Sequence, residues 1–225
     1  MRPLAYITLF FAPAIAIAIY LYCIKRYEKD FLKLLIKSYL AGVLGISVLL
    51  VAEFIGSWLG LNDVRSLKRT LFYSFITIGG SAELGKFLFF RYLIVPDKRV
   101  DRPIYGIVFS VMTALGFATI FLVFYAINIF GIQQIFPSTM YTMIFVPANI
   151  LFAVVMGFFI GMAKFLKARI AFYLIGLFGA AFFHGMCNFC LITHDFKLLS
   201  LFSFGSMVIV FILGIKASYC KPDPS

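Results

Sequence analysis

The sequence predicts an all-α protein, a polytopic membrane bundle of about seven transmembrane helices. Of its 225 residues, 63% are hydrophobic and only 13% are charged, and the mean hydropathy is +1.04. A soluble domain of this length buries its core with far less apolar surface, so the composition indicates an integral membrane protein. Seven apolar runs are each long enough to cross a bilayer, which takes about 20 helical residues. The gaps between them are short, so we expect residues 1–225 to form a single membrane domain.

Polar, charged or turn-forming residues separate the seven runs. In chain order, the expected spans are 4–24, 34–60, 70–95, 104–130, 141–166, 170–193 and 198–216. The first run is too long for the apolar core of a signal peptide, so we interpret it as a retained helix. Gly56-x-x-x-Gly60 and Gly157-x-x-x-Gly161 predict close packing of the second and fifth helices against neighbours, because glycine lets two backbones approach.

The charge pattern predicts an orientation in the membrane. The net charge is +11, and the basic residues lie mostly in the short gaps between apolar runs. We interpret them as topology signals and contacts with anionic lipid, and we expect a lipid bilayer and no nucleic acid among the partners. Ten basic residues fall on one side of the bundle and five on the other. This excess predicts an N-terminus outside and a C-terminus in the cytoplasm.

A few polar residues interrupt the apolar runs and mark a candidate site. Glu83 and Lys86 lie within the third run, and His184 and Asn188 lie four apart in the sixth, on one helix face. An ionisable group at this depth costs roughly 3 kcal/mol or more, so it usually has a function. Glu53, in the second run, is expected at a similar depth. The structural alternatives are an ion pair between Glu83 and Lys86 at i+3, and a hydrogen bond from His184 to a neighbouring helix.

Four motifs in register resemble those of a known family. They are Ala82-Glu83-Leu84-Gly85-Lys86-Phe87, the segment 101–109 (DRPIYGIVF), Gly116-Phe117-Ala118 and His184-Gly185-Met186-Cys187-Asn188. Together they resemble the PrsW family of intramembrane proteases, which is grouped with the CAAX prenyl proteases and bacteriocin-processing enzymes. The resemblance covers residues 79–188. It implies a protein of the bacterial cytoplasmic membrane that acts on a membrane protein or peptide substrate.

The chain departs from the family pattern at three positions. The family has a Glu-Glu pair where this sequence has Ala82 before Glu83, and a Phe-x-x-x-Glu motif where this sequence ends in Phe121. Tyr105 stands where the intervening loop usually has an aspartate. Two motif glutamates are therefore missing, and Ala82 could be a natural or an engineered residue.

Three hypotheses follow for the function. In an active protease, Glu83 would serve as general base or metal ligand with His184 as its partner, and Asn188 would orient the scissile carbonyl. Glu53 could complete the set. A catalytic zinc generally has three protein ligands, whereas Glu83 and His184 supply only two, so the metal content stays open.

The second hypothesis is a catalytically inactive pseudo-protease that binds membrane proteins as an adaptor or regulator. A phenyl ring at position 121 excludes water and accepts no hydrogen bond, so we expect the chain to cleave transmembrane substrates poorly or not at all. The third hypothesis is a membrane thiol oxidoreductase that uses Cys187-x-x-Cys190. Cysteine in a membrane helix more often serves as a small apolar residue.

Overall fold

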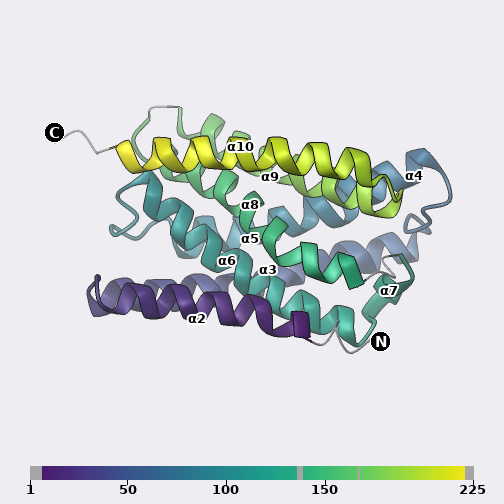
Figure 1. The fold of residues 1–225 in the computed structure, drawn as a ribbon, viewed down its shortest axis with the longest axis horizontal. Coiled ribbons are helices and arrows are strands. Elements are labelled where there is room, and N and C mark those ends of the chain that lie inside the picture. The colour runs from purple at the N-terminus through teal and green to yellow at the C-terminus, as the bar shows by residue number, and fades with distance from the viewer. Residues whose placement is uncertain (1–6, 136–138, 167, 221–225) are drawn as a thin grey trace.

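The computed structural model describes residues 7–135, 139–166 and 168–220, and this part contains helices and no strand (Figure 1). The expected all-α fold is confirmed. The elements are η1 (Thr8–Phe10), α2 (Phe11–Ile24), α3 (Lys29–Trp58), α4 (Leu67–Phe72), η2 (Tyr73–Gly80), α5 (Ser81–Leu93), α6 (Pro103–Ala126), η3 (Ile129–Gly131), α7 (Ile132–Ile135), α8 (Thr139–Ala163), α9 (Arg169–Ile192) and α10 (Phe196–Tyr219).

The elements correspond to the expected spans, with three differences in form. Within the described residues, five helices are long and apolar enough to cross a membrane by themselves: α3, α6, α8, α9 and α10. The first apolar helix, Thr8–Ile24, is shorter. The third expected span is divided into α4, η2 and α5, which follow one another without a break. Helix α3 begins at Lys29, five residues before the expected span, because the helix continues into a charged stretch that a hydropathy criterion excludes.

The third span contains a π-helix just before the candidate site. Residues Tyr73–Gly80 form this wider helix, and α5 continues from it with Glu83 in its first turn. π-Helical turns are rare and are frequent at functional sites. A Cβ atom at Gly79 would lie 2.8 Å from the backbone nitrogen of Gly185. The absence of a side chain at Gly79 therefore lets η2 pack closely on α9 and brings the start of α5 next to the helix that carries His184.

Helix α6 lies at the centre of the bundle and begins with Pro103, which suits the first helical position because proline has no N–H to leave unpaired. In an apolar stretch of 18 residues within α6, 72% of the residues are buried. A Cβ atom at Gly106 would lie 2.6 Å from the carbonyl oxygen of Gly157 and 2.9 Å from the Cα of Gly161. The predicted close packing at Gly157-x-x-x-Gly161 is confirmed.

In the other glycine pair, only one member packs closely. A Cβ atom at Gly56 would meet the side chain of Asn62 at 2.3 Å and Cγ2 of Thr77, in η2, at 3.5 Å, and one at Gly60 would meet nothing within 4 Å. Gly60 instead has a φ of +66° just after the end of α3, a left-handed conformation that glycine adopts without strain. Gly56 therefore faces both the turn after α3 and η2 of the third span, whereas Gly60 shapes the turn and does not pack against another span.

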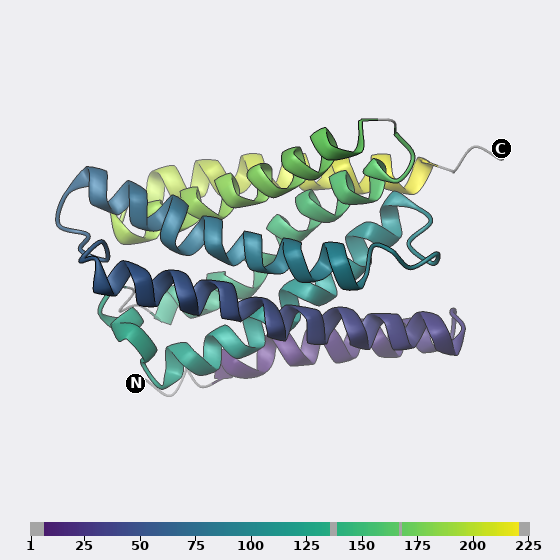
Figure 2. The ribbon, with the colours of Figure 1, turned by 180° about the vertical axis from the view of Figure 1, so that it is seen from behind.

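The basic loops meet at one end of the bundle. Figures 1 and 2 show the α2–α3, α5–α6 and α8–α9 connections at the same end as the C-terminus, with the N-terminus at the other end. Lys164 donates to the backbone oxygen of Asp97 (2.8 Å), and Arg99 donates to the backbone oxygen of Asp30. A hydrogen bond from Arg99 Nε (2.7 Å) lowers the pKa of Asp97 to about 2. These contacts join the α5–α6 connection to the α8–α9 connection and to the first turn of α3, and the side of the membrane on which they lie stays a prediction.

Candidate functional site

Helices α5 and α9 bring Glu83, Lys86 and His184 together. Lys86 follows Glu83 by three residues on the same face of α5, and its Nζ lies 2.6 Å from Oε1 of Glu83. The Nδ1 atom of His184 lies 2.7 Å from the same oxygen. A carboxylate only accepts hydrogen bonds, so Nδ1 carries a proton. Both structural alternatives are therefore realised at once: the local ion pair and the contact between helices share one oxygen atom.

A third helix contributes a residue that the sequence analysis missed. Asn149, in the middle of α8, accepts a hydrogen bond from Lys86 Nζ through Oδ1 (2.7 Å) and donates from Nδ2 to the backbone oxygen of Phe145 (2.9 Å). The available signal was an amide side chain inside an otherwise apolar run, two residues after Pro147. Lys86 is thus held between a carboxylate on its own helix and an amide on another.

The charged groups are completely enclosed, as expected for residues that face the bundle. Glu83 is 0% exposed, and Lys86, His184 and Asn188 are each 2% exposed. The ammonium group balances the carboxylate, which offsets part of the cost of burying either charge. The Oε2 atom of Glu83 has no hydrogen-bond partner within the described residues.

A cavity about the size of one water molecule lies beside His184 and Asn188. Its volume is about 10 Å³, close to the minimum that holds a water. Tyr141 also lines it, and the Nδ2 atom of Asn188 is buried without a partner in the part of the chain that the structure describes. An amide donor left in this state normally bonds to a water or a ligand. A small polar group in this cavity would therefore lie next to both the amide donor of Asn188 and the ring of His184.

Aromatic rings enclose the other sides of this cavity. Phe152 stacks on the imidazole of His184 with ring centroids 5.0 Å apart, and Phe145 lies 6.5 Å from it. Phe121, in α6, is 1% exposed and stacks on Phe145 at 4.2 Å. One phenyl ring therefore separates position 121 from the histidine. Ala82 is fully buried and contributes no polar atom.

Glu53 lies in a different hydrogen-bond group. Its Oε1 accepts from the hydroxyl of Tyr73 (3.0 Å), and its Oε2 accepts from Nδ2 of Asn62 (2.9 Å). Its side chain is 1% exposed. The structure shows no hydrogen bond between Glu53 and either Glu83 or His184, and its partner Tyr73 was not anticipated from the sequence.

The donor set does not fit a tightly bound catalytic metal. Among residues 7–135, 139–166 and 168–220, no three His, Cys, Asp or Glu side chains are grouped as metal ligands. The Oε1 atom of Glu83 already faces the ammonium of Lys86, which would repel a divalent cation. The amide of Asn188 is a weak third ligand for zinc, which prefers nitrogen, thiolate and carboxylate donors. Metal ligation by Glu83 and His184 stays a prediction, and this geometry does not support it.

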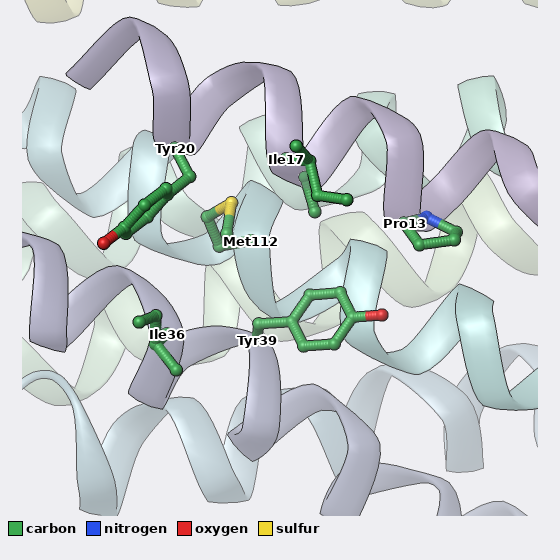
Figure 3. Close-up of a pocket in the computed structure, with 7 residues that line it drawn as sticks. Pro13, Ile17, Tyr20, Ile36, Tyr39 and Met112 are labelled. Carbon is green, nitrogen blue, oxygen red and sulfur yellow. The ribbon is translucent and has the colours of Figure 1, made fainter. Parts of the chain in front are cut away.

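Two other features form no hydrogen bond with the group at Glu83 within the described residues. Cys187 and Cys190 are buried, free thiols on α9, and Cys187 lines the small cavity. A larger cavity of about 340 Å³ lies between α2, α3 and α6, where Tyr20, Tyr39 and Met112 are among its lining residues (Figure 3). It shares no residue with the cavity at His184.

The geometry defines a polytopic membrane protein that encloses a carboxylate–histidine pair and a water-sized cavity. The family model for the PrsW family intramembrane metalloprotease matches residues 31–215. The chain belongs to this family.

Curated relatives agree with this assignment. Protease PrsW of Shouchella clausii is 29% identical over 206 residues, which is 91% of each chain. Protease PrsW of Geobacillus kaustophilus is 27% identical, covering 82% of this chain and 78% of the relative, and that of Bacillus subtilis is 26% identical, covering 80% and 79%. No solved structure matches.

Proposed function

We propose that this chain binds transmembrane or membrane-proximal peptide segments, as the protease fold of its family implies, and hydrolyses them slowly or not at all. One observation carries the proposal: the Oε1 atom of Glu83 accepts from both Lys86 and His184 in a fully enclosed site. A general base needs a free lone pair directed at the proton that it removes. Here Oε1 already accepts two hydrogen bonds, and although Oε2 has no partner within the described residues, Glu83 does not line the water-sized cavity.

The aromatic surroundings support the same conclusion. In the family pattern that the motifs resemble, glutamates stand at the positions of Phe121 and Ala82, and a second carboxylate could hold and activate a water. Phe121 instead stacks on Phe145 and extends the apolar wall beside His184. The cavity holds at most one small molecule, so a substrate carbonyl and a water do not fit there together without movement of the walls.

The test is proteolysis in reconstituted membranes. Purified protein in liposomes is mixed with a single-span reporter peptide that carries a fluorophore and a quencher on its two ends. We expect wild-type cleavage close to the background of empty liposomes. We expect the double variant Ala82→Glu with Phe121→Glu to cleave at least tenfold faster, because both carboxylates of the family pattern are restored.

Two controls keep this test decisive. Adding Glu83→Gln to the double variant should abolish the regained activity, since the retained carboxylate is then neutral. Both buried positions gain a larger or charged side chain, so thermal unfolding in detergent must show a folded double variant. If it does not fold, the single variant Phe121→Glu and the wild-type rate alone decide the question. Rapid cleavage by the wild type would refute the proposal.

A second candidate, a working protease, is favoured by the cavity itself. The bond from Nδ1 to Glu83 leaves Nε2 of His184 as the ring atom able to accept a proton from a water. The unpartnered Nδ2 of Asn188 could polarise a peptide carbonyl. In this case His184→Ala and Asn188→Ala would each abolish a readily measured wild-type activity, whereas Glu53→Gln, in a separate hydrogen-bond group, would leave it nearly unchanged.

A further inference from the structure

An apolar groove runs between α8 and α10 on the side of the bundle that carries the cavity at His184. Its volume is about 350 Å³, and α9 closes it at Cys187. Three methionines line it, Met140, Met143 and Met207. Methionine side chains are flexible and pack against varied apolar surfaces, which suits a site that accepts more than one sequence.

The groove shares a wall with the candidate site. Ile144, Ala148, Phe152 and Cys187 line both the groove and the small cavity beside His184. The ring of Phe152 stacks on the imidazole, so a single phenyl side chain both lines the groove and covers the histidine. A rotation of this side chain, or of Ile144, would join the two spaces.

Helix α10 is the loosely held wall of the groove. In an apolar stretch of 18 residues within α10, only 11% of the residues are buried, compared with 67% in the corresponding stretch of α8. Figure 1 shows α10 at the outer edge of the bundle, in front of α9. Few buried contacts mean a low cost of displacement, so α10 can shift without unfolding the core.

The groove face of α10 suits an apolar helix. Ser200, Ser203 and Ser206 recur every three residues along it, and small residues let another helix approach closely in a membrane. The hydroxyls of Ser200 and Ser206 donate to carbonyl oxygens four residues earlier, at 2.8 Å and 2.7 Å. They therefore present no unpaired donor to an apolar partner.

We propose that this groove is the lateral docking site for the apolar transmembrane segment of another membrane protein, which lies along α8 and α10 and reaches the cavity past Phe152. This proposal rests on the proposed function for its substrate class. A peptide fits better than a lipid chain because the space beyond Phe152 contains the unpartnered Nδ2 of Asn188. A backbone carbonyl can accept from that donor, and an acyl chain cannot.

Photocrosslinking tests the docking site. The probe is a synthetic 23-residue Leu-Ala peptide with lysines at both ends and one diazirine-bearing leucine at its centre, reconstituted with the full-length protein in liposomes. We expect mass spectrometry to map the adducts to groove residues on α8 and α10. Ser203→Trp, which fills the groove, should lower the adduct yield at least fivefold. Phe204→Trp, on the neighbouring residue that is 69% exposed, should keep the yield within twofold of wild type.

Each outcome supports or overturns the proposal. Equal yields from Ser203→Trp and Phe204→Trp, or adducts mapped only to α2 and α3, would overturn it. A phospholipid with a diazirine in its acyl chain provides the competing occupant: if its labelling of the groove does not fall when the peptide is saturating, the groove is a lipid site. If Ser203→Trp fails to fold, Ser200→Phe at the exposed rim replaces it. Labelling requires no hydrolysis, so a rapid wild-type protease would refute the slow-cleavage proposal and leave this one standing.

Discussion

Replacement of Lys86 by methionine tests how much the buried charge network contributes to stability. Lys86→Met keeps most of the side-chain volume and removes the ammonium that lies 2.6 Å from Oε1 of Glu83 and 2.7 Å from Oδ1 of Asn149. The carboxylate then keeps only its contact with His184, in a site that is 0% exposed. Removal of one partner of a buried ion pair costs about 3–5 kcal/mol, because the remaining charge stays uncompensated.

This cost corresponds to a large fall in melting temperature. For chains of this length, 1 kcal/mol shifts the midpoint by about 2–4 °C, so we expect a decrease of about 6–20 °C. Thermal unfolding in a mild detergent can be followed with a thiol-reactive dye, because Cys187 and Cys190 are buried and free in the folded state. The double variant Glu83→Gln with Lys86→Met removes both charges and should recover most of the loss.

The chain offers a matched control for this experiment. Lys33 pairs with Asp30 at the same i,i+3 spacing and a similar distance of 2.9 Å, with 76% and 67% of the side chains exposed. Solvent screens such a pair, so Lys33→Met should leave the melting temperature unchanged within error. A Lys86→Met protein that melts within 2 °C of the wild type, or a double variant as unstable as the single one, would show that the network is not the closed ion pair described above.

Two further predictions concern packing and pH. Gly116→Ala should destabilise the bundle by about 1–3 kcal/mol, because a Cβ atom there would lie 1.9 Å from the backbone oxygen of Tyr39. A Cβ atom at Gly205 would meet nothing within 4 Å, so Gly205→Ala should be neutral or stabilising by up to about 1 kcal/mol. Thermal unfolding of both variants measures these changes. The pKa of Asp97 is about 2 in the folded state because of Arg99, below its ordinary value of 3.8, so the bond stabilises the fold above pH 3.8 and its contribution disappears as pH falls toward 2. The difference in melting temperature between wild type and Asp97→Asn should therefore be constant near neutral pH and shrink below pH 4, and a difference that persists at pH 2 would contradict the assignment.

The sequence was sufficient for the properties that depend on local order along the chain. Apolar runs of about 20 residues predicted the helical membrane bundle, because a chain in lipid must satisfy its backbone hydrogen bonds within each span. The pairing of Glu83 with Lys86 also followed from the sequence, since residues three apart share a helix face. The retained motif residues Glu83, His184 and Asn188 pointed to one enclosed region, and the structure places them there.

Only the tertiary structure decided how each helix is rotated about its axis. Depth in the membrane can be counted along a helix, and Glu53, Glu83 and His184 were expected at similar depths. The rotation of each helix cannot be obtained from residue positions in this way, because these spans are apolar on nearly every face and have little amphipathic character. Packing turns Glu53 toward Tyr73, and it turns Asn149 of α8 toward Lys86.

The π-helix at Tyr73–Gly80 has the same cause. A run of apolar residues has the same hydropathy whether it forms an α-helix or a π-helix, so the sequence predicted one continuous span there. The close contact between Gly79 and Gly185 accompanies the wider turn and sets the rotation of α5 relative to α9. Length and hydropathy therefore determined which segments cross the membrane. Contacts between helices determined which side chains meet inside it, because in an apolar solvent packing and polar pairing set the direction that each helix face takes.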